Sequence, residues 1–498
     1  MEAKEPVADE LRYNKFSVIY IQVFSVERFD VSQLCAGRFA EVDNSIDGQI
    51  FVTDELHGSQ VKRYGVRGFD FSLSLDEPYP VTLSGHIFVE VSVFFERTVS
   101  VTYRMVVDGD YCRCSDAIST DHLISLAALN MGAEHWSCDD DKKFSTINLD
   151  ITDMRVENLY LDEHGQWLEA PVVLPEDEGL NNFGDIQNRY KRLIGRNQTF
   201  SETKDMNYVY VDVWEDVAHT EGLFSAMKEP EIIDHIYHAH GRELTGLMSL
   251  YPYEWPYRTD ECFDDVCGSN VAIDTDDLIL VNPNVCVVFG TYGLRGKDSP
   301  TDWENHLRER KRYHVSWPEY LLILEMVLAK KYTITAALDL FLHNTIRVSS
   351  LRHARGVLEE NARRVLRVTK LLLQLDAVKY SRYVSHKIMF ERTTRRLEVD
   401  RDVARLNDAM DKIDQSLFNI SEMRKLKQSG VLNVVLGCIS AASLFGILFQ
   451  QIEVPFLQRF GLNEFAGSVG MFIIFFTLML IVFGSVMLIV LSLRNDKL

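Results

Sequence analysis

Two short acidic segments bring several carboxylates close together in the sequence. They are TDECFDDV at 259–266 and DTDD at 274–277. Carboxylate oxygens are the ligands that hard divalent cations such as Mg²⁺ take in proteins, although the Asp-x-Asp-x-Asp-Gly order of a calcium-binding loop is missing. The candidate metal ligands are Asp260, Asp264, Asp265, Asp276 and Asp277.

Two other fragments approach known motifs but fail on spacing. A P-loop would need Gly in place of Thr291 and Ser or Thr in place of Asp298 in GTYGLRGKDS. The fragment HIYHAHGRE lacks zinc-binding spacing, which favours a solvated helix surface. Its polar members are His235, His238, His240 and Glu243. Because no nucleophile elbow or dinucleotide fingerprint occurs either, we expect the protein not to be an enzyme.

Two long stretches near the end of the sequence carry no charge. They run from Gly430 to Ile452 and from Ala466 to Leu493. Each exceeds the ~20 apolar residues that a helix needs to cross a bilayer. Lys and Arg before the first stretch and after the second place both termini in the cytoplasm. The pattern predicts a transmembrane hairpin and a multi-pass protein of the inner (plasma) membrane.

At helical spacing, small and polar residues fall on one face of the first predicted span. They are Asn433, Gly437, Ser440, Leu444, Ile447 and Gln451. Such a face avoids lipid and meets protein or water. We interpret these residues as pore-lining, with helix packing inside a simple anchor as the alternative.

The first ~170 residues are expected to be rich in strands, because β-branched and aromatic residues dominate FSVIYIQVFSV and HIFVEVSVFF. Turns are predicted at Asp108-Gly109 and at 163–165. From about residue 205 the pattern becomes mixed. MNYVYVDVWE predicts a strand, 217–244 a helical region, and DDLILVNPNVCVVFG two strands that turn at 282–284.

From Pro318 onward the chain is expected to be helical, since no Gly or Pro lies between Val357 and Ser429. Apolar residues then alternate at spacings of four and three, which defines an a/d seam. They are Val399, Val403, Leu406, Met410, Ile413, Leu417 and Ile420. The seam faces either other subunits or the chain's own helix at 351–390. We therefore divide the chain into an α/β sensor head at 1–317, a helical stalk at 318–429 and the transmembrane hairpin with its tail at 430–498.

The net charge is −21, and acidic residues dominate the first 300 positions. An acidic head on a more basic stalk suggests self-assembly or attraction of cations, with a solvated acidic surface as the alternative. No direct nucleic-acid partner is expected.

This arrangement resembles the CorA-type divalent-cation transporters. That resemblance implies an α+β cytosolic head, a long stalk helix and a two-helix C-terminal transmembrane hairpin, assembled as a homopentamer. The run FGILFQQIEVP stands where the family carries Gly-Met-Asn, and Phe449-Gln450-Gln451 replace that motif. The predicted outer mouth of the pore is formed by Phe449, Gln450, Gln451 and Glu453.

The large head is most similar to the divergent CorA-like proteins that accompany type III CRISPR systems. The resemblance implies an antiviral membrane channel gated by a nucleotide second messenger, an S-adenosylmethionine–AMP conjugate. A site for this ligand is expected to use Tyr253, Trp255, Arg352, Arg355, Arg363 and Arg364.

Two alternatives are open at this point. One is a housekeeping magnesium or divalent-cation transporter, and the other is a membrane-anchored binding or enzymatic domain without a pore. No resident cofactor is expected beyond Mg²⁺ or another divalent cation as a permeant or regulatory ion.

Overall fold

A computed structural model describes a β-sheet, the helices that pack on it and some single positions elsewhere in the chain. The described residues are 10–26, 29, 39–41, 61–94, 97–129, 154–174, 183–195, 204–216, 227–250, 255–257, 262–275, 277–290, 318–347, 363, 383–412, 415, 429–430, 433, 436–437, 440, 477 and 484. The chain divides into two compact units, Met1–Asp339 with Arg367–Ala404 and Leu340–Leu366 with Arg405–Leu498.

The first unit is organised by a mixed sheet of 12 strands. Ten lie in the order β11-β12-β10-β1-β5-β6-β4-β3-β8-β9, while β2 pairs with β3 and β7 with β1. The strands are β1 (Arg12–Ser25), β2 (Phe39–Glu41), β3 (Val61–Leu75), β4 (Val81–Phe94), β5 (Thr98–Val107), β6 (Cys112–Cys114), β7 (Ile118–Ser119), β8 (Met154–Leu161), β9 (Trp167–Leu174), β10 (Met206–Asp216), β11 (Asp277–Val281) and β12 (Val285–Gly290).

Strand β1 is the centre of this sheet. It pairs antiparallel with β5 on one side and with β10 on the other, and β10 pairs parallel with β12. Residues 16–24 of β1 are buried without a break, as is the whole of β5. Successive side chains of a strand point to opposite faces of the sheet. Because both faces are buried here, both sets of side chains must be mainly apolar, which accounts for the run SVIYIQVF.

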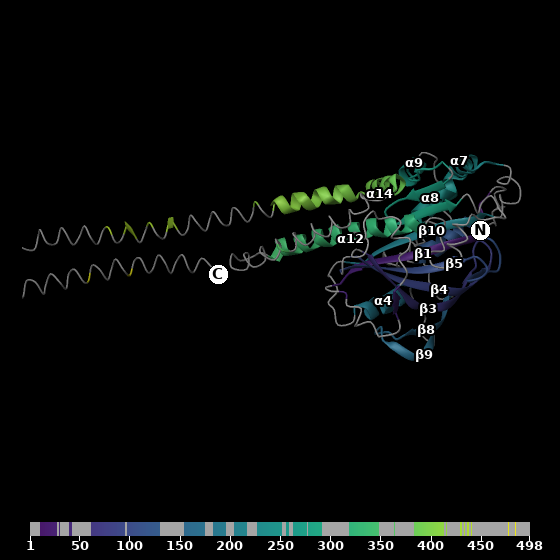
Figure 1. The fold of residues 1–498 in the computed structure, drawn as a ribbon, viewed down its shortest axis with the longest axis horizontal. Coiled ribbons are helices and arrows are strands. Elements are labelled where there is room, and N and C mark those ends of the chain that lie inside the picture. Colours follow the sequence, from purple (N-terminus) through teal and green to yellow (C-terminus); the bar gives the residue numbers. More distant parts are fainter. Residues whose placement is uncertain are drawn as a thin grey trace, which may run out of the picture. The chain divides into compact units, whose positions relative to one another are not determined.

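The helices of this unit cover both faces of the sheet (Figure 1). They are α3 (Thr120–Ala128), α4 (Phe183–Ile194), α7 (Glu229–Ala239), α8 (Gly241–Ser249), the 3₁₀ turn η4 (Trp255–Tyr257), α9 (Cys262–Val266), α12 (Pro318–Arg347) and α14 (Val384–Arg396). On β5, Tyr103 contacts the rings of Phe183 and Tyr190 in α4. Since neighbouring side chains on a strand point to opposite faces, Arg104 points away from α4 and toward the face that α12 covers.

Helices α12 and α14 lie side by side (Figure 1). The hydroxyls of Tyr320 and Thr393 are 2.9 Å apart, and Lys331 Nζ donates to the carbonyl of Leu397 at 2.9 Å. Burial lowers the pKa of Lys331, against the raising effect of Asp402 and Glu398.

Two arginines fasten α14 to the segment between α9 and β12. Arg392 donates to the carbonyl oxygens of Val271 and Ala272. Arg396 Nε donates to the carbonyl of Val281 at 3.0 Å, and its guanidinium lies against Gly268. Because Gly268 has a φ of +62°, the absent side chain serves both the backbone turn and this close approach.

The seam predicted from 399 onward is partly described. Helix α14 ends at a left-handed residue, Glu398, and a further helix spans 399–412. Val399 and Leu406 are buried, whereas Arg405 between them is exposed. This burial occurs within a single chain, and packing of the seam against other subunits stays a prediction.

The structure corrects the predicted fold class and localisation. The described chain is a mixed α/β fold around a twelve-stranded sheet, and no described helix is long and apolar enough to cross a membrane. Among the described helices α12 is the longest, and its apolar side chains are buried as far as Ala337, with Glu319, Glu325 and Lys330 buried among them. A head on a long stalk helix with a transmembrane hairpin, in the inner membrane, is therefore wrong for the chain as described. Apart from single positions, the stretches 430–452 and 466–493 lie outside the described residues.

The contact between Gly268 and Arg396 leads to a first prediction. Gly268→Ala should lower the free energy of unfolding through backbone strain of about 1–2 kcal/mol. Displacement of the Arg396 guanidinium, which loses its hydrogen bond to the carbonyl of Val281, adds about 0.5–1.5 kcal/mol. Gly109→Ala is the matched control, because its φ is +88° and open space surrounds it. Urea denaturation of both variants measures the difference. Equal losses would show that the Arg396 contact contributes nothing.

Candidate functional site: a buried ion network beneath helix α12

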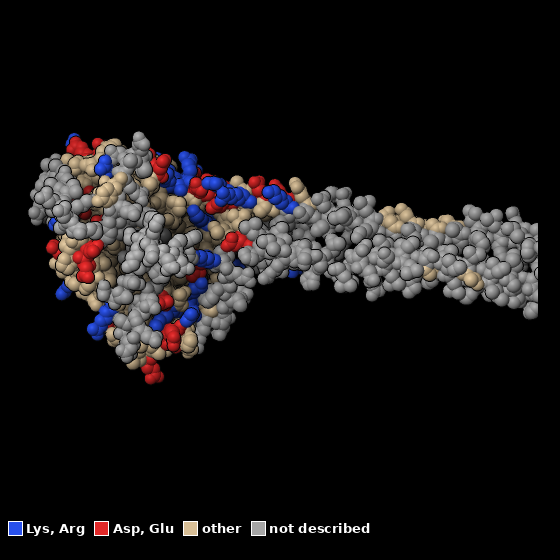
Figure 2. All heavy atoms as spheres, turned by 180° about the vertical axis from the view of Figure 1, so that it is seen from behind, with Lys and Arg blue, Asp and Glu red and all other residues tan. Residues whose placement is uncertain are grey.

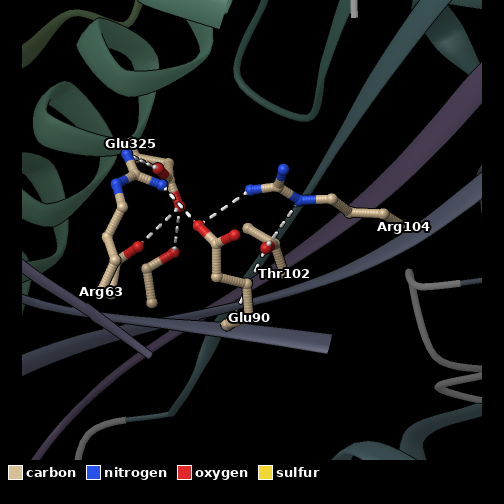
Figure 3. Close-up of polar contacts among 7 residues, drawn as sticks. Arg63, Glu90, Thr102, Arg104 and Glu325 are labelled. Atoms are coloured by element: carbon tan, nitrogen blue, oxygen red, sulfur yellow. Dashed lines mark hydrogen bonds and ion pairs between the residues drawn. The ribbon is translucent and has the colours of Figure 1, made fainter. Parts of the chain in front are cut away.

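Four charged side chains meet between the sheet and α12 (Figure 3). Arg63 of β3 lies at the centre, with one guanidinium nitrogen 2.8 Å from Glu90 Oε1 and the other 2.8 Å from Glu325 Oε2. Arg104 of β5 approaches the same Glu90 oxygen at 3.1 Å. The network thus contains two positive and two negative charges, and Glu325 is its contribution from α12.

Hydroxyl groups surround part of the charged cluster. Ser92 and Ser100 donate to Glu325 Oε1 at 3.4 and 3.3 Å. Arg104 Nε donates to Thr102 Oγ1 at 3.3 Å, and Thr102 Oγ1 donates to the backbone carbonyl of Glu90 at 3.5 Å. Hydrogen bonds of this kind lower the cost of burying the charges.

Strand register brings these residues onto one face. Ser92 of β4 lies opposite both Arg63 of β3 and Ser100 of β5. Two residues further along, Glu90 lies opposite Thr102 of β5. Residues two apart on a strand point to the same face, so the antiparallel pairing of three strands assembles the polar set without any loop.

Helix α12 makes further polar contacts along the same side. Tyr332 OH accepts from the backbone N–H of Ser25 at 3.2 Å, and Thr333 Oγ1 lies 3.1 Å from Thr98 Oγ1. These residues follow Glu325 by seven and eight positions, so all three lie on one helical face. The helix is therefore positioned against the sheet at two points about two turns apart.

The network is nearly closed to solvent, and Glu90 is its most exposed member, with 10% of its side chain accessible. Arg63 and Glu325 have fully buried side chains, and Arg104 is only 1% exposed. The guanidinium groups of Arg63 and Arg104 and the carboxylate of Glu325 are therefore almost completely shielded from solvent. Removal of one partner from a buried pair lowers the free energy of unfolding by about 3–5 kcal/mol. The network therefore favours the one position of α12 along the sheet at which Glu325 meets Arg63.

The predicted metal ligands are not brought together in the described structure. Asp264 and Asp265 are exposed on α9, whereas Asp277 is buried at the start of β11. Asp260 and Asp276 lie outside the described residues. Among described residues, no group of three or more His, Cys, Asp or Glu side chains could hold a metal ion. On the described part of the face in Figure 2, acidic side chains lie among Lys and Arg.

Of the residues predicted to bind a nucleotide, Trp255 and Arg363 are described. Trp255 is buried in η4, and its Nε1 donates to Asp121 Oδ1 at 2.9 Å. This indole is therefore a structural contact of the helical layer. Arg363 is helical and exposed. Outside the described residues lie Tyr253, Arg352, Arg355 and Arg364.

The predicted pore face is described at three positions. Asn433, Gly437 and Ser440 are helical and exposed. The remaining pore-lining and outer-mouth residues lie outside the described part of the chain, namely Leu444, Ile447, Phe449, Gln450, Gln451 and Glu453. The pore assignment stays a prediction.

Sequence reasoning did not single out the ion network, although a signal was present. Glu90 interrupts HIFVEVSVFF, Arg104 interrupts VSVTYRMVV and Glu325 interrupts LLILEMVLA. A charged residue inside an otherwise apolar run occupies a buried position and needs a partner. Which charges pair across distant segments depends on strand order, which periodicity does not give.

The histidine fragment also differs from its prediction. His238 is exposed as expected, but His240 and Glu243 are buried and bonded to each other, with His240 Nδ1 2.8 Å from Glu243 Oε1. The prediction of a solvated surface was wrong for these two residues, because α7 ends at His240 and α8 begins there in a new direction, and Glu243 in its first turn accepts from the N–H of Leu11.

Comparisons with family models, with curated proteins and with solved structures give no match for this chain. The resemblance to CorA-type proteins stays a prediction from the sequence.

A second prediction tests the energetic weight of the network. Arg63→Met and Glu325→Leu should each lower the free energy of unfolding by about 3–5 kcal/mol, because each leaves a buried charge without its partner. The double variant leaves Arg104 and Glu90 as a balanced pair. Its loss should therefore be smaller than the sum of the single losses by about 0.5–3 kcal/mol.

Chemical denaturation of the four proteins in this cycle gives the coupling energy. Glu157→Gln serves as the control, since it removes an exposed pair in which Arg155 Nε lies 2.8 Å from Glu157 Oε1. Its effect should stay below about 1 kcal/mol. Additive losses in the double variant would contradict the interpretation of Arg63 and Glu325 as a coupled pair.

Proposed function

We propose that this chain is a regulatory, non-catalytic protein whose α/β unit senses a ligand and passes the event to α12. The observation that carries the proposal is the buried ion network between β3, β4, β5 and α12. A packed interface with charges at fixed positions favours a switch between two discrete arrangements over a gradual deformation. A relay requires such a switch.

The placement of the helices supports the same role. Any shift of the three strands moves Arg63 and Glu90, and Glu325 must follow because an unpaired buried charge is costly. Tyr320 and Lys331 then connect α12 to α14. A chain of contacts of this kind demonstrates coupling only when ligand binding is shown to shift the equilibrium between its two arrangements. The test therefore measures how α12 responds to the ligand.

The ligand is assigned from the sequence resemblance. We propose a nucleotide second messenger, the S-adenosylmethionine–AMP conjugate, in an antiviral setting, with Mg²⁺ as the alternative effector. The ion-channel function and magnesium transport stay predictions, because the residues on which they depend lie mostly outside the described chain.

A third prediction follows for the intact protein. Hydrogen exchange of the full chain, with and without the S-adenosylmethionine–AMP conjugate, should show altered protection of α12 when the ligand is bound. Glu325→Gln should bind the ligand, measured by calorimetry, but lose much of the change in α12, because the charge that ties the helix to the sheet is gone. Glu157→Gln should respond as the unmodified protein does.

Three outcomes decide the matter. Binding without any change in α12 would refute the relay. A response to Mg²⁺ alone would replace the nucleotide with a divalent cation as the effector. An unchanged response in Glu325→Gln would show that the signal bypasses the network.

A further inference from the structure

A single left-handed residue separates α14 from the helix that follows it. Helix α14 spans Val384–Arg396, and the next helix spans 399–412. Between them, Glu398 has a φ of +55°. Its N–H donates to the carbonyl of Arg395 at 3.0 Å, and its own carbonyl accepts from the N–H of Asp402 at 3.1 Å. The junction is therefore a hydrogen-bonded turn of defined shape.

The buried sides of the two helices are out of phase with each other. The buried residues of α14 are Met389, Phe390, Thr393 and Thr394. In the following helix Val399 and Leu406 are buried, and Val403 is half-buried. At about 100° per residue, an unbroken helix would place the second set roughly 140° around from the first. The positions that an unbroken helix would keep in phase with α14 are all exposed, namely Asp400, Arg401, Ala404 and Asp408. The left-handed residue therefore rotates the second helix so that its apolar side is buried.

Lys331 of α12 is bonded to this junction. Its Nζ donates to the carbonyl oxygen of Leu397 at 2.9 Å. In an unbroken α-helix that oxygen would accept from the N–H of Arg401, four residues further on. The carboxylates of Asp402 and Glu398 favour the charged form of Lys331. A second helix thus supplies a charged donor to a carbonyl that the change of direction removes from the regular helical pattern.

Opposing contributions to the free energy meet at this junction. A left-handed residue other than glycine is unfavourable, because its Cβ comes too close to the following carbonyl oxygen. The half-buried Lys331 is unfavourable as well, because its ammonium group loses part of its hydration. The burial of Val399 and Leu406 acts in the opposite direction. A segment with strain on one side and burial on the other is suited to two arrangements of similar free energy.

We propose that the junction at Leu397 and Glu398 is a conformational switch with a bent and a straight arrangement. In the bent arrangement Lys331 holds the Leu397 carbonyl, and Val399 is buried. In the straight arrangement Glu398 is helical, the Leu397 carbonyl accepts from the N–H of Arg401, and α14 continues without a break. The seam that begins at Val399 then points away from the side on which α14 is buried.

Withdrawal of Lys331 releases the junction. Lys331 follows Glu325 by six residues on α12, so a displacement of this helix moves both side chains. The trigger therefore rests on the relay proposed above, whereas the two arrangements rest on the junction alone. A test that replaces Lys331 and uses no ligand distinguishes failure of the switch from failure of the relay.

A fourth prediction measures the two arrangements by electron paramagnetic resonance. In the full chain, spin labels replace Lys387 and Ala404, which are exposed on either side of the junction, and are attached through non-native amino acids. An unbroken helix would separate the two Cα atoms by about 26 Å, and any bend shortens this distance. The unmodified protein should show mainly a shorter distance. Lys331→Met should raise the ratio of straight to bent molecules at least about tenfold, because a hydrogen bond from a charged donor is lost.

Glu398→Gly should reverse this change. Glycine adopts the left-handed conformation without strain and is unfavourable inside a helix. In the Lys331→Met protein, Glu398→Gly should therefore lower the ratio of straight to bent molecules at least about tenfold. Glu391→Gly is the matched control, because it makes the same replacement at an exposed site within α14. It should leave the population at the longer distance in place.

Urea denaturation establishes that each variant folds. If Lys331→Met does not fold, Lys331→Gln replaces it with the same expected direction, since the shorter, uncharged side chain weakens the bond to Leu397. The absence of a longer distance in the folded Lys331 variant would overturn the switch. An equal response to Glu398→Gly and Glu391→Gly would overturn it as well, because the left-handed conformation of Glu398 would then play no part.

Discussion

The cost of leaving a buried charge without a partner governs how this fold is assembled. Two arginines and two glutamates lie between the sheet and α12. Removing the partner of any one of them would lower the free energy of unfolding by several kcal/mol, because a buried charge would remain without compensation. A slip of β4 by one residue would turn Glu90 and Ser92 to the opposite face of the sheet. Arg63 would then lose its contact with Glu90. The network therefore specifies strand register and helix position together, a specificity that apolar packing alone provides less sharply.

The placement of α14 depends in turn on α12. Tyr320 meets Thr393 and Lys331 caps the end of α14, so the second helix is aligned on the first. Arg392 and Arg396 then donate to backbone carbonyls between α9 and β12. These bonds satisfy oxygens next to β11, a strand at one end of the sheet order whose residues are all buried. The two helices thus cover one face of the sheet and are also bonded to the segment around β11, at one end of the strand order.

Local elements could be predicted from the sequence, whereas their partners could not. The strands in the first 170 residues, the turns at 108–109 and 163–165, the β11–β12 turn and the helix start at Pro318 all agree with the structure. Periodicity and turn chemistry determine such features within a few residues of chain. The pairing of Arg63 with Glu325 spans 262 positions, and the burial of Trp255 against Asp121 depends on how helices dock. The predicted fold class was wrong in its stalk helix and transmembrane hairpin, since no described helix is long and apolar enough to cross a membrane.

Strand β1 connects two sets of polar contacts, one at Glu243 of α8 and one at α12. Leu11, just before the strand, donates its N–H to Glu243, while Ser25 at the other end donates its N–H to Tyr332 of α12. A strand paired on both edges cannot slide by less than two residues without misplacing its side chains. The pairing therefore fixes the position of β1 along its axis relative to β5 and β10. The polar cluster at Glu243 and the contacts of α12 therefore hold β1 at its two ends.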